Sequence, residues 1–243
     1  MRYQFLVLMC AAWLDVAQAT DLVGFTEEFA PFNYTENGQH KGLANEIIDR
    51  ISSKTGLKIE RKVYPWLRAV EANQALDNSL LYTTVRTPER ESKFLWVGPF
   101  DECEIWLIKL KSRKDVVAST VEQAKQYRVG APRGSAGNGL LLSKGFKEDK
   151  LDLSLDEDRN TRKLFAGRFD YSVGMIVSHY ASARKLKLPV DDLEPTLRLE
   201  KGLGCYFAFN PKVDPKLFQR FSEAFSVLEK SGELEKIRSS FLN

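Results

Sequence analysis

The feature that most constrains the fold is a strand, helix, strand order near the start of the chain. Residues 21–25 are largely apolar, and residues 57–63 alternate between apolar and polar side chains, as strands do. Between them lies an amphipathic helix, with Gly56 just past its end as a cap. A βαβ unit of this length has a right-handed crossover and parallel strands, so the sequence predicts an α/β fold. The apolar side chains of the helix recur every fourth residue: Leu43, Ile47 and Ile51.

A second set of strands and helices begins after residue 110. Two apolar strands connect it with the first set. A unit that is inserted through two strands can move as a body about them, so these strands predict a hinge. We expect lobe 1 at residues 20–102 and 206–243, and lobe 2 at residues 103–205.

Residues 1–19 have the pattern of a secretory signal peptide. Arg2 supplies a positive charge, residues 5–14 form an apolar run, and residues 17–19 have the small-x-small form of a signal peptidase site. The run is too short to span a bilayer, for which about 20 apolar residues are needed. We expect the mature chain to begin at Thr20 and to function outside the cytoplasm.

Two cysteines remain once the signal peptide is removed, Cys103 and Cys205. An even number of cysteines in an oxidising compartment favours a disulfide between them. The alternative is a pair of buried free thiols, because cysteine also packs well as a small hydrophobic residue.

Charge and motif content argue against several classes of function. The chain has 243 residues and a formal net charge of +3, without a basic run that interleaves aromatic residues, so we expect no nucleic-acid partner. The glycines at positions 134, 137 and 139 do not fit a nucleotide-binding fingerprint. His40 lies in a turn and His179 in a helix, and there is no metal-ligand spacing, cysteine–histidine pair or nucleophile elbow. We therefore expect no cofactor, no metal and no enzymatic activity.

Two aromatic loops and an arginine follow the strands of the first half. Phe29 lies in the loop after the first strand, Trp66 follows the second, and Arg90 follows a third apolar stretch at residues 80–85. Ligands of open parallel sheets gather outside the carboxyl ends of the strands, where these side chains emerge. An arginine there can bind a carboxylate, because its guanidinium group is planar and stays positively charged at every relevant pH. Aromatic rings packed on neighbouring elements, and a surface position for Arg90, are the alternatives.

Several short motifs occur along the mature chain in a characteristic order. They are Ala30-Pro31-Phe32, Tyr64-Pro65-Trp66, Thr87-Pro88-Glu89-Arg90, Val97-Gly98-Pro99-Phe100 and Ala166-Gly167-Arg168-Phe169-Asp170. With these motifs the chain resembles the family-3 extracellular solute-binding proteins of bacterial polar amino acid transport. The resemblance implies a two-lobed α/β fold of the periplasmic binding protein type II, whose lobes close over a small ligand.

In the first lobe the resemblance implies an aromatic cleft with a carboxylate site. Phe29 and Trp66 match the aromatic walls of the family's cleft, and Arg90 matches the arginine that takes the ligand's α-carboxylate. Thr84 belongs to the expected lining, whereas Val85 stands where the family usually has a hydroxyl residue that helps to hold the carboxylate.

In the second lobe the resemblance implies further ligand contacts, but one expected ligand contact, an aspartate, is missing. Residues 133–139 form a small-residue loop before a helix, where free backbone N–H groups bind anions. Ser135 and the N–H of Ala136 match the family's carboxylate contacts in this loop. Met175 stands where the family usually has an aspartate for the ligand's ammonium. A thioether cannot balance a buried ammonium, and leaving such a charge unpaired is costly.

These matches predict a protein that binds a small carboxylate or amino acid-like solute in an interlobe cleft for uptake. Because Met175 replaces the aspartate, either the ligand lacks a normally placed ammonium, or Glu27 or Glu28 takes the amine. The alternative is a sensor or protein-interaction module that has lost amino acid binding; a dehydratase-like enzyme on this fold is less favoured. We expect a monomeric periplasmic protein whose permease or receptor is a separate chain.

Overall fold

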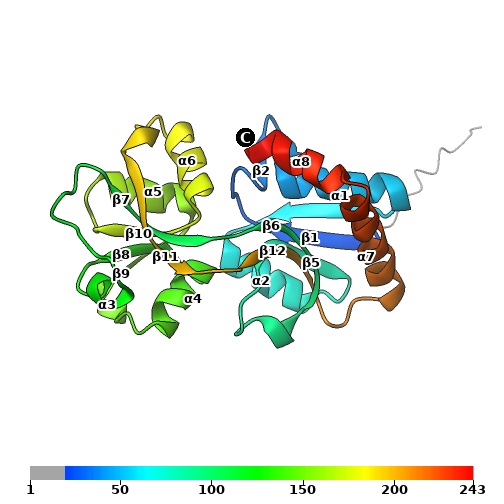
Figure 1. Cartoon of the computed structure of the whole chain (residues 1–243). Coiled ribbons are helices and arrows are strands. Elements are labelled where there is room, and N and C mark those ends of the chain that lie inside the picture. The colour runs from blue at the N-terminus through cyan, green and yellow to red at the C-terminus, as the bar shows by residue number, and fades with distance from the viewer. Residues whose placement is uncertain (1–19, 243) are drawn as a thin grey trace, which may run out of the picture.

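The structure, a computed structural model, describes residues 20–242 and consists of two lobes that lie side by side (Figure 1). Each lobe is built on a five-stranded sheet. The predicted signal peptide lies outside the described residues. Within residues 20–242, no helix combines the length and the apolar character needed to cross a membrane.

Lobe 1 is a mixed sheet covered by helices, with strand order β4-β1-β5-β12-β6. Strands β1, β4 and β5 are parallel, and β12 is antiparallel to both of its neighbours. The strands are β1 (Leu22–Thr26), β4 (Ile59–Val63), β5 (Ser79–Val85), β6 (Leu95–Glu102) and β12 (Gly204–Phe209), with a hairpin of β2 (Tyr34–Glu36) and β3 (Gln39–Lys41). The helices are α1 (Leu43–Thr55), α2 (Trp66–Ala75), α7 (Pro215–Lys230) and α8 (Glu233–Leu242), with a 3₁₀ turn at Glu91–Lys93.

Lobe 2 has the strand order β11-β7-β10-β8-β9. Strands β8, β9 and β10 are parallel, and β7 is antiparallel to β10 and β11. The strands are β7 (Ile105–Leu110), β8 (Val129–Pro132), β9 (Leu151–Ser154), β10 (Tyr171–Gly174) and β11 (Leu193–Glu200). The helices are α3 (Val121–Ala124), α4 (Ala136–Ser143), α5 (Glu157–Phe165) and α6 (Ile176–Lys185), with 3₁₀ turns at Glu148–Lys150 and Val190–Asp192.

The predicted strand, helix, strand unit is confirmed. Strands β1 and β4 pair in parallel along their whole length, and α1 connects them. The helix ends at Gly56, whose φ of 72° is left-handed and whose N–H donates to the Ser52 carbonyl. Helices α7 and α8 pack against α1 (Figure 1). The apolar side of α1 is fully buried at Leu43, Ala44, Ile47, Ile48 and Ile51.

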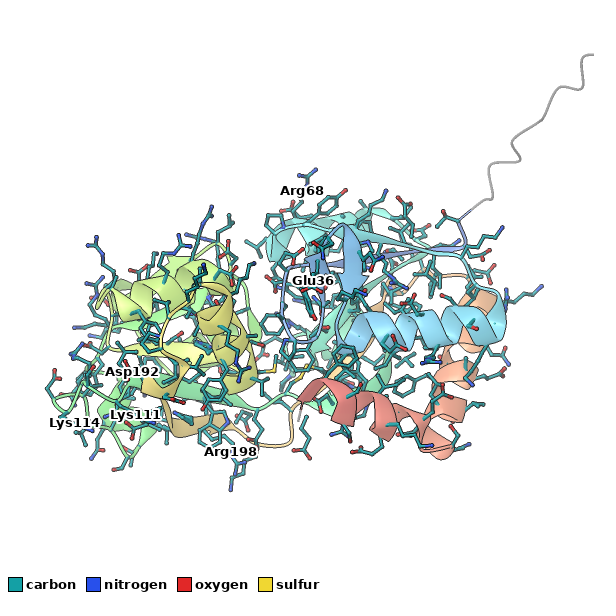
Figure 2. The ribbon with its side chains drawn as sticks, turned by 90° about the horizontal axis from the view of Figure 1, so that it is seen from above. Glu36, Arg68, Lys111, Lys114, Asp192 and Arg198 are labelled. Carbon is teal, nitrogen blue, oxygen red and sulfur yellow. A yellow bond between two sulfur atoms is a disulfide. The ribbon has the colours of Figure 1, made fainter. Side chains whose placement is uncertain are left out.

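Two segments connect the lobes, one between β6 and β7 and the other between β11 and β12. The sequence predicted that lobe 1 resumes at residue 206. However, Cys205 already pairs with Val85 and Asp101 in the lobe 1 sheet, so we propose that lobe 1 resumes at Gly204. Figure 2 shows Arg198, on β11, close to the place where the chain passes from one lobe to the other.

A disulfide joins Cys103 and Cys205, where the connecting segments meet lobe 1. Their Cα atoms are 5.5 Å apart, and both residues are fully buried. Of the two alternatives that the sequence left open, the structure therefore contains the bridge and not the pair of thiols. The bridge ties the end of β6 to the start of β12, which are the two points where the chain leaves and re-enters lobe 1.

Gly42 fixes the aromatic loop of lobe 1 against the start of α1. Its φ is 105°, and a Cβ atom at this position would lie 2.5 Å from the Phe32 carbonyl oxygen. The same approach lets Leu43 and Ala44 donate their N–H groups to the carbonyls of Pro31 and Phe32. The loop that carries Phe29 therefore depends on a residue without a side chain at position 42.

We expect Gly42→Ala to lower the melting temperature by several degrees. A non-glycine residue in such a backbone conformation costs about 1–3 kcal/mol, before the clash with a backbone carbonyl is counted. For a chain of this size, each kcal/mol corresponds to about 2–4 °C. Gly139→Ala in α4 is the matched control, because a Cβ atom there meets nothing within 4 Å. An unchanged melting temperature for Gly42→Ala would contradict the packing described here.

Candidate functional site

A narrow cavity lies between the lobes at the carboxyl ends of their strands; we call it the central cavity. The centre of a water molecule can occupy a volume of about 50 Å³ inside it. This is more than a single water molecule needs. Lobe 1 contributes Glu27, Phe29, Trp66, Thr83, Val85 and Arg90. The lobe 2 residues that matter for its chemistry are Ser135, Ala136, Glu157, Gly174 and Met175.

Trp66 reaches from lobe 1 to lobe 2. It is the first residue of α2, directly after Pro65, and the residue is 6% exposed. Its Nε1–H donates to the Gly134 carbonyl of lobe 2 at 2.9 Å. Phe29 lies in the loop after β1 and stacks on Phe32, with ring centroids 5.8 Å apart. Both predicted aromatic residues therefore line the central cavity, and their contact with a ligand stays a prediction.

Arg90 brings a mostly buried positive charge to the same cavity. Its Nη1 donates to the Val85 carbonyl at 3.2 Å, and its Nη2 donates to the Gly134 carbonyl at 3.0 Å. The guanidinium carbon lies 5.2 Å from the centre of the Trp66 ring, which is a cation–π distance. Burial lowers the pKa of Arg90 to about 10, against the opposing effect of Glu27, so the group stays charged at neutral pH.

No carboxylate of residues 20–242 lies within 4.0 Å of the Arg90 guanidinium nitrogens. Its two hydrogen bonds to the protein go to neutral carbonyl groups, which are weaker acceptors than a carboxylate. A mostly buried cation without a paired anion is costly. The central cavity is therefore suited to an anionic group of a ligand.

The start of α4 forms the lobe 2 side of the cavity next to Arg90. Ser135 caps this helix, and its hydroxyl accepts a hydrogen bond from the Asn138 N–H. The preceding Gly134 has a φ of 72° and turns its carbonyl toward lobe 1. The first N–H groups of a helix, here beginning with Ala136, have no partner within the helix. The predicted residues Ser135 and Ala136 thus lie across the cavity from Arg90 and Trp66.

The two acidic candidates of the sequence occupy different places. Glu27 lines the central cavity, and burial raises its pKa to about 8, although Arg90 acts in the opposite direction. Glu28 is exposed and does not line this cavity; its Oε2 accepts from the Thr35 N–H at 2.9 Å. Adjacent residues after a strand point to different sides, so only Glu27 turns inward.

Glu157 is a cavity residue that the sequence analysis missed. It is the first residue of α5, follows the capping residue Asp156, and is 6% exposed. Its Oε1 accepts from the Thr161 hydroxyl at 3.3 Å and lies 3.2 Å from His179 Nε2. Burial, and secondarily Glu27, raise its pKa. An aspartate followed by a glutamate, which are the cap and first turn of a helix, was the available signal in the sequence.

His179 lies next to Glu157, behind the cavity wall. It is fully buried in α6, and burial lowers its pKa to about 4, so the ring is neutral at pH 7. Its Nδ1 lies 3.0 Å from the Met175 carbonyl, and its Nε2 lies 2.6 Å from the Ser172 hydroxyl. A carbonyl only accepts, so Nδ1 carries the proton and Nε2 accepts. Neither Ser172 nor His179 lines the central cavity, so they do not form a nucleophile with its base.

Thr84, which the sequence predicts among the ligand-binding residues, lies behind the cavity wall, and its neighbour Thr83 lines the central cavity. Thr84 is fully buried and does not line the cavity, whereas Thr83 and Val85 do. Thr83 has a φ of 57°, and the pairing of β5 with β12 shifts register nearby, so side chains no longer alternate regularly. The Thr83 hydroxyl donates to the Asn33 side chain. Met175 lines the cavity as predicted and is 5% exposed.

A second space, the outer cavity, continues from the central one between the lobes. By the same measure its volume is about 410 Å³, and it shares Phe29 and Glu157 with the central cavity. Lobe 1 adds Glu28 and Glu36, and Figure 2 shows Glu36 at the edge of lobe 1 that faces lobe 2. Lobe 2 adds Ser178, whose hydroxyl is buried without a hydrogen-bond partner among the described residues. Within residues 20–242, no group of three metal-ligating side chains occurs.

Comparisons with known proteins agree with this architecture. The sequence model of "Bacterial extracellular solute-binding proteins, family 3" matches residues 22–243. The arginine-binding extracellular protein ArtP of Bacillus subtilis is 24% identical over 236 residues, covering 90% of this chain and 85% of that protein. The probable amino-acid-binding protein YxeM of Bacillus subtilis is 24% identical over 224 residues, covering 91% of this chain and 83% of that protein.

Solved structures share the fold. A histidine kinase sensor domain with similarity to periplasmic binding proteins has a TM-score of 0.82 at 22% identity, over 92% of this chain and 96% of that one. An ancestral arginine-binding protein bound to arginine has a TM-score of 0.79 at 20% identity, over 92% of this chain and 98% of that one. The predicted two-lobed periplasmic binding protein fold is confirmed.

Proposed function

Because the chain belongs to the bacterial extracellular solute-binding proteins of family 3, we propose that it captures a small carboxylate or amino acid-like solute in the central cavity for uptake. The observation that carries this proposal is Arg90, a mostly buried cation whose hydrogen bonds go to neutral carbonyls. A bidentate carboxylate is the ligand group that fits a guanidinium best.

Binding and closure are coupled in this proposal. The solute's carboxylate faces Arg90 from lobe 1 and the first N–H groups of α4 from lobe 2, so both lobes gain a contact only when they are together. Trp66 and Phe29 exclude water from these contacts, and low water content strengthens hydrogen bonds to charged groups. The solute thereby stabilises the closed arrangement of the lobes.

Export and partners follow the same proposal. Residues 1–19 direct the chain to the periplasm, where a monomer collects its solute and delivers it to a separate membrane permease. The similar proteins include the arginine-binding extracellular protein ArtP and the probable amino-acid-binding protein YxeM. Binding without conversion implies that the solute is recovered chemically unchanged, which mass spectrometry of the released ligand measures.

A second candidate function is a sensor on the same fold that has given up amino acid binding. Met175, which lines the cavity where the family resemblance predicts an aspartate, favours it. A histidine kinase sensor domain shares this fold. Such a module has no need for a small-acid ligand, whereas the uptake function requires one.

A thermal-shift screen of small carboxylates and amino acids on the secreted protein tests the proposed function. At a concentration of 100 Kd, a ligand of the native state stabilises it by about 2.7 kcal/mol. This corresponds to about 5–10 °C for a chain of this size. Chloride and phosphate salts at equal ionic strength are the controls. If no carboxylate shifts the melting temperature beyond these salts, the uptake function is wrong and the sensor is favoured.

A further inference from the structure

We propose that Gly134 of lobe 2 is the docking point of an interlobe latch, and that Leu67 of lobe 1, which lies outside both cavities, controls closure of the lobes by packing on it. Trp66 and Arg90 complete the latch from lobe 1. Because the latch consists of protein groups alone, it acts whichever solute binds and does not depend on the proposed function. Leu67 and Gly134 are therefore positioning residues, which act on the angle between the lobes.

The carbonyl group of Gly134 is the first half of the latch. Two lobe 1 side chains donate hydrogen bonds to its oxygen, Trp66 Nε1–H at 2.9 Å and Arg90 Nη2 at 3.0 Å. A carbonyl oxygen has two lone pairs, so these two bonds fill its capacity as an acceptor. The bond from Arg90 is charge-assisted, and such bonds are roughly twice as strong as neutral ones. Lobe 1 therefore satisfies this carbonyl completely when the lobes are together.

The missing side chain of Gly134 is the second half. A Cβ atom at this position would lie 2.4 Å from Leu67 Cδ2 and 3.3 Å from Leu67 Cγ, so the leucine packs directly on the glycine backbone. Leu67 lies in the first turn of α2, and Figure 1 shows α2 and α4 at the facing edges of the two lobes. Its side chain is at the surface, where the residue is 44% exposed. A side chain at position 134 would therefore push the lobes apart.

Hydrogen bonds within lobe 2 fix the loop that carries the latch carbonyl. The Gly134 N–H donates to Asn138 Oδ1 at 3.1 Å, and the Ser135 N–H donates to the Pro132 carbonyl at 3.2 Å. The φ of Gly134 is 72°, a left-handed conformation that glycine adopts without strain. These bonds do not involve lobe 1, so they can orient the carbonyl in either arrangement of the lobes. Docking on a loop that is already ordered has a low entropic cost.

Arg90 connects the latch with the solute. A guanidinium group has more N–H groups than its bonds to the Val85 and Gly134 carbonyls use, so Arg90 can bind a carboxylate and stay in the latch. A solute on Arg90 then fixes the side chain that also reaches lobe 2. The solute can enter only while the latch is open, and the closed latch slows its escape.

Distances between spin labels on the two lobes test the latch. Ser53→Cys and Lys147→Cys place one label on an exposed residue of α1 and the other on an exposed residue of the loop after α4. The secreted protein is freed of bound solutes by unfolding and refolding without reductant, which keeps the native disulfide. Double electron–electron resonance then measures the populations of closed and open lobes. We expect a closed population at the label distance that the structure gives.

Two substitutions in lobe 1 should weaken the latch in this labelled protein. Leu67→Ala should lower the ratio of closed to open lobes by about threefold to tenfold, because an apolar contact is lost. Trp66→Phe keeps an aromatic ring but removes the N–H donor, and it should lower the ratio by about twofold to tenfold. Leu76→Ala is the matched control, since Leu76 follows the other end of α2 and is 40% exposed. We expect it to leave the ratio unchanged, and circular dichroism checks that each variant is folded.

A double variant separates docking between the lobes from strain within lobe 2. Gly134→Ala alone should lose most of the closed population, because its Cβ atom collides with Leu67 and because alanine is strained at this φ. Shortening Leu67 removes the collision but not the strain. Leu67→Ala/Gly134→Ala should therefore be closed more often than Gly134→Ala, whereas Leu76→Ala/Gly134→Ala should show no such recovery.

Three outcomes overturn the latch. A native protein with only open distances shows that these contacts are too weak to hold the lobes together. An unchanged ratio in Leu67→Ala shows that this side chain does not control closure. If Gly134→Ala is equally open with and without Leu67→Ala, its effect is strain within lobe 2. Each outcome leaves the proposed function standing, because the thermal-shift screen tests that function separately.

Discussion

Arg90→Ala is expected to weaken binding of the solute by about 2–5 kcal/mol, which is about 30-fold to several thousand-fold. The guanidinium carries the positive charge that lines the central cavity, and its Nη2 also joins lobe 1 to the Gly134 carbonyl of lobe 2. Its removal leaves the solute's carboxylate without a counter-charge in a space poor in water. Any ligand found in the thermal-shift screen should lose most of its stabilising effect in this variant.

Arg86→Ala is the matched control for Arg90→Ala. Arg86 lies four residues earlier, its side chain is 37% exposed, and it pairs with Glu91 outside the central cavity. We expect its removal to leave the affinity unchanged. Arg90→Lys keeps the charge but loses the planar fork, so it should bind with an intermediate affinity. Circular dichroism of the ligand-free variants separates lost binding from lost folding. A full thermal response in a folded Arg90→Ala protein would remove Arg90 from the site.

Loss of the disulfide is expected to lower the free energy of unfolding by about 2–5 kcal/mol. Cys103 and Cys205 are 102 residues apart in sequence, so the bridge closes a long loop that contains all of lobe 2. A bridge over such a loop restricts the unfolded chain strongly in the entropic account of disulfide stability. For a chain of this size, the melting temperature of Cys103→Ala/Cys205→Ala should fall by about 4–20 °C.

Single variants and mass spectrometry make the disulfide prediction specific. Cys103→Ala alone should destabilise the protein about as much as the double variant, because either change removes the bond. Both cysteines are fully buried, so alkylation must be carried out on the unfolded protein. Without reductant, intact mass should be unchanged by the alkylating agent, and with reductant it should rise by two adducts. Two alkylated thiols without reductant would end the disulfide prediction.

The sequence was sufficient for features that depend on local pattern and on chain order. The spacing of Leu43, Ile47 and Ile51 predicted α1, and the apolar runs on either side predicted the parallel strands β1 and β4. Sheet topology then directed the loops after these strands to one edge, so Phe29 and Trp66 were placed at the central cavity correctly. These predictions succeed because amphipathic periodicity and the direction of parallel strands leave few alternatives.

Only the tertiary structure showed where a side chain lies when its position depends on one backbone angle or on one helix boundary. Thr83 has a left-handed φ, and its side chain lines the central cavity where the sequence predicted that of Thr84. After β1, Glu27 points into the central cavity and Glu28 points away from it. Glu157 reaches the cavity because α5 begins at that residue. A shift of one residue turns a side chain to the opposite face of a strand, and helix ends vary by a turn with little change in local propensity. The family and the cavity position of Arg90 were therefore accessible from the sequence, whereas the cavity position of Glu157 required the folded arrangement of both lobes.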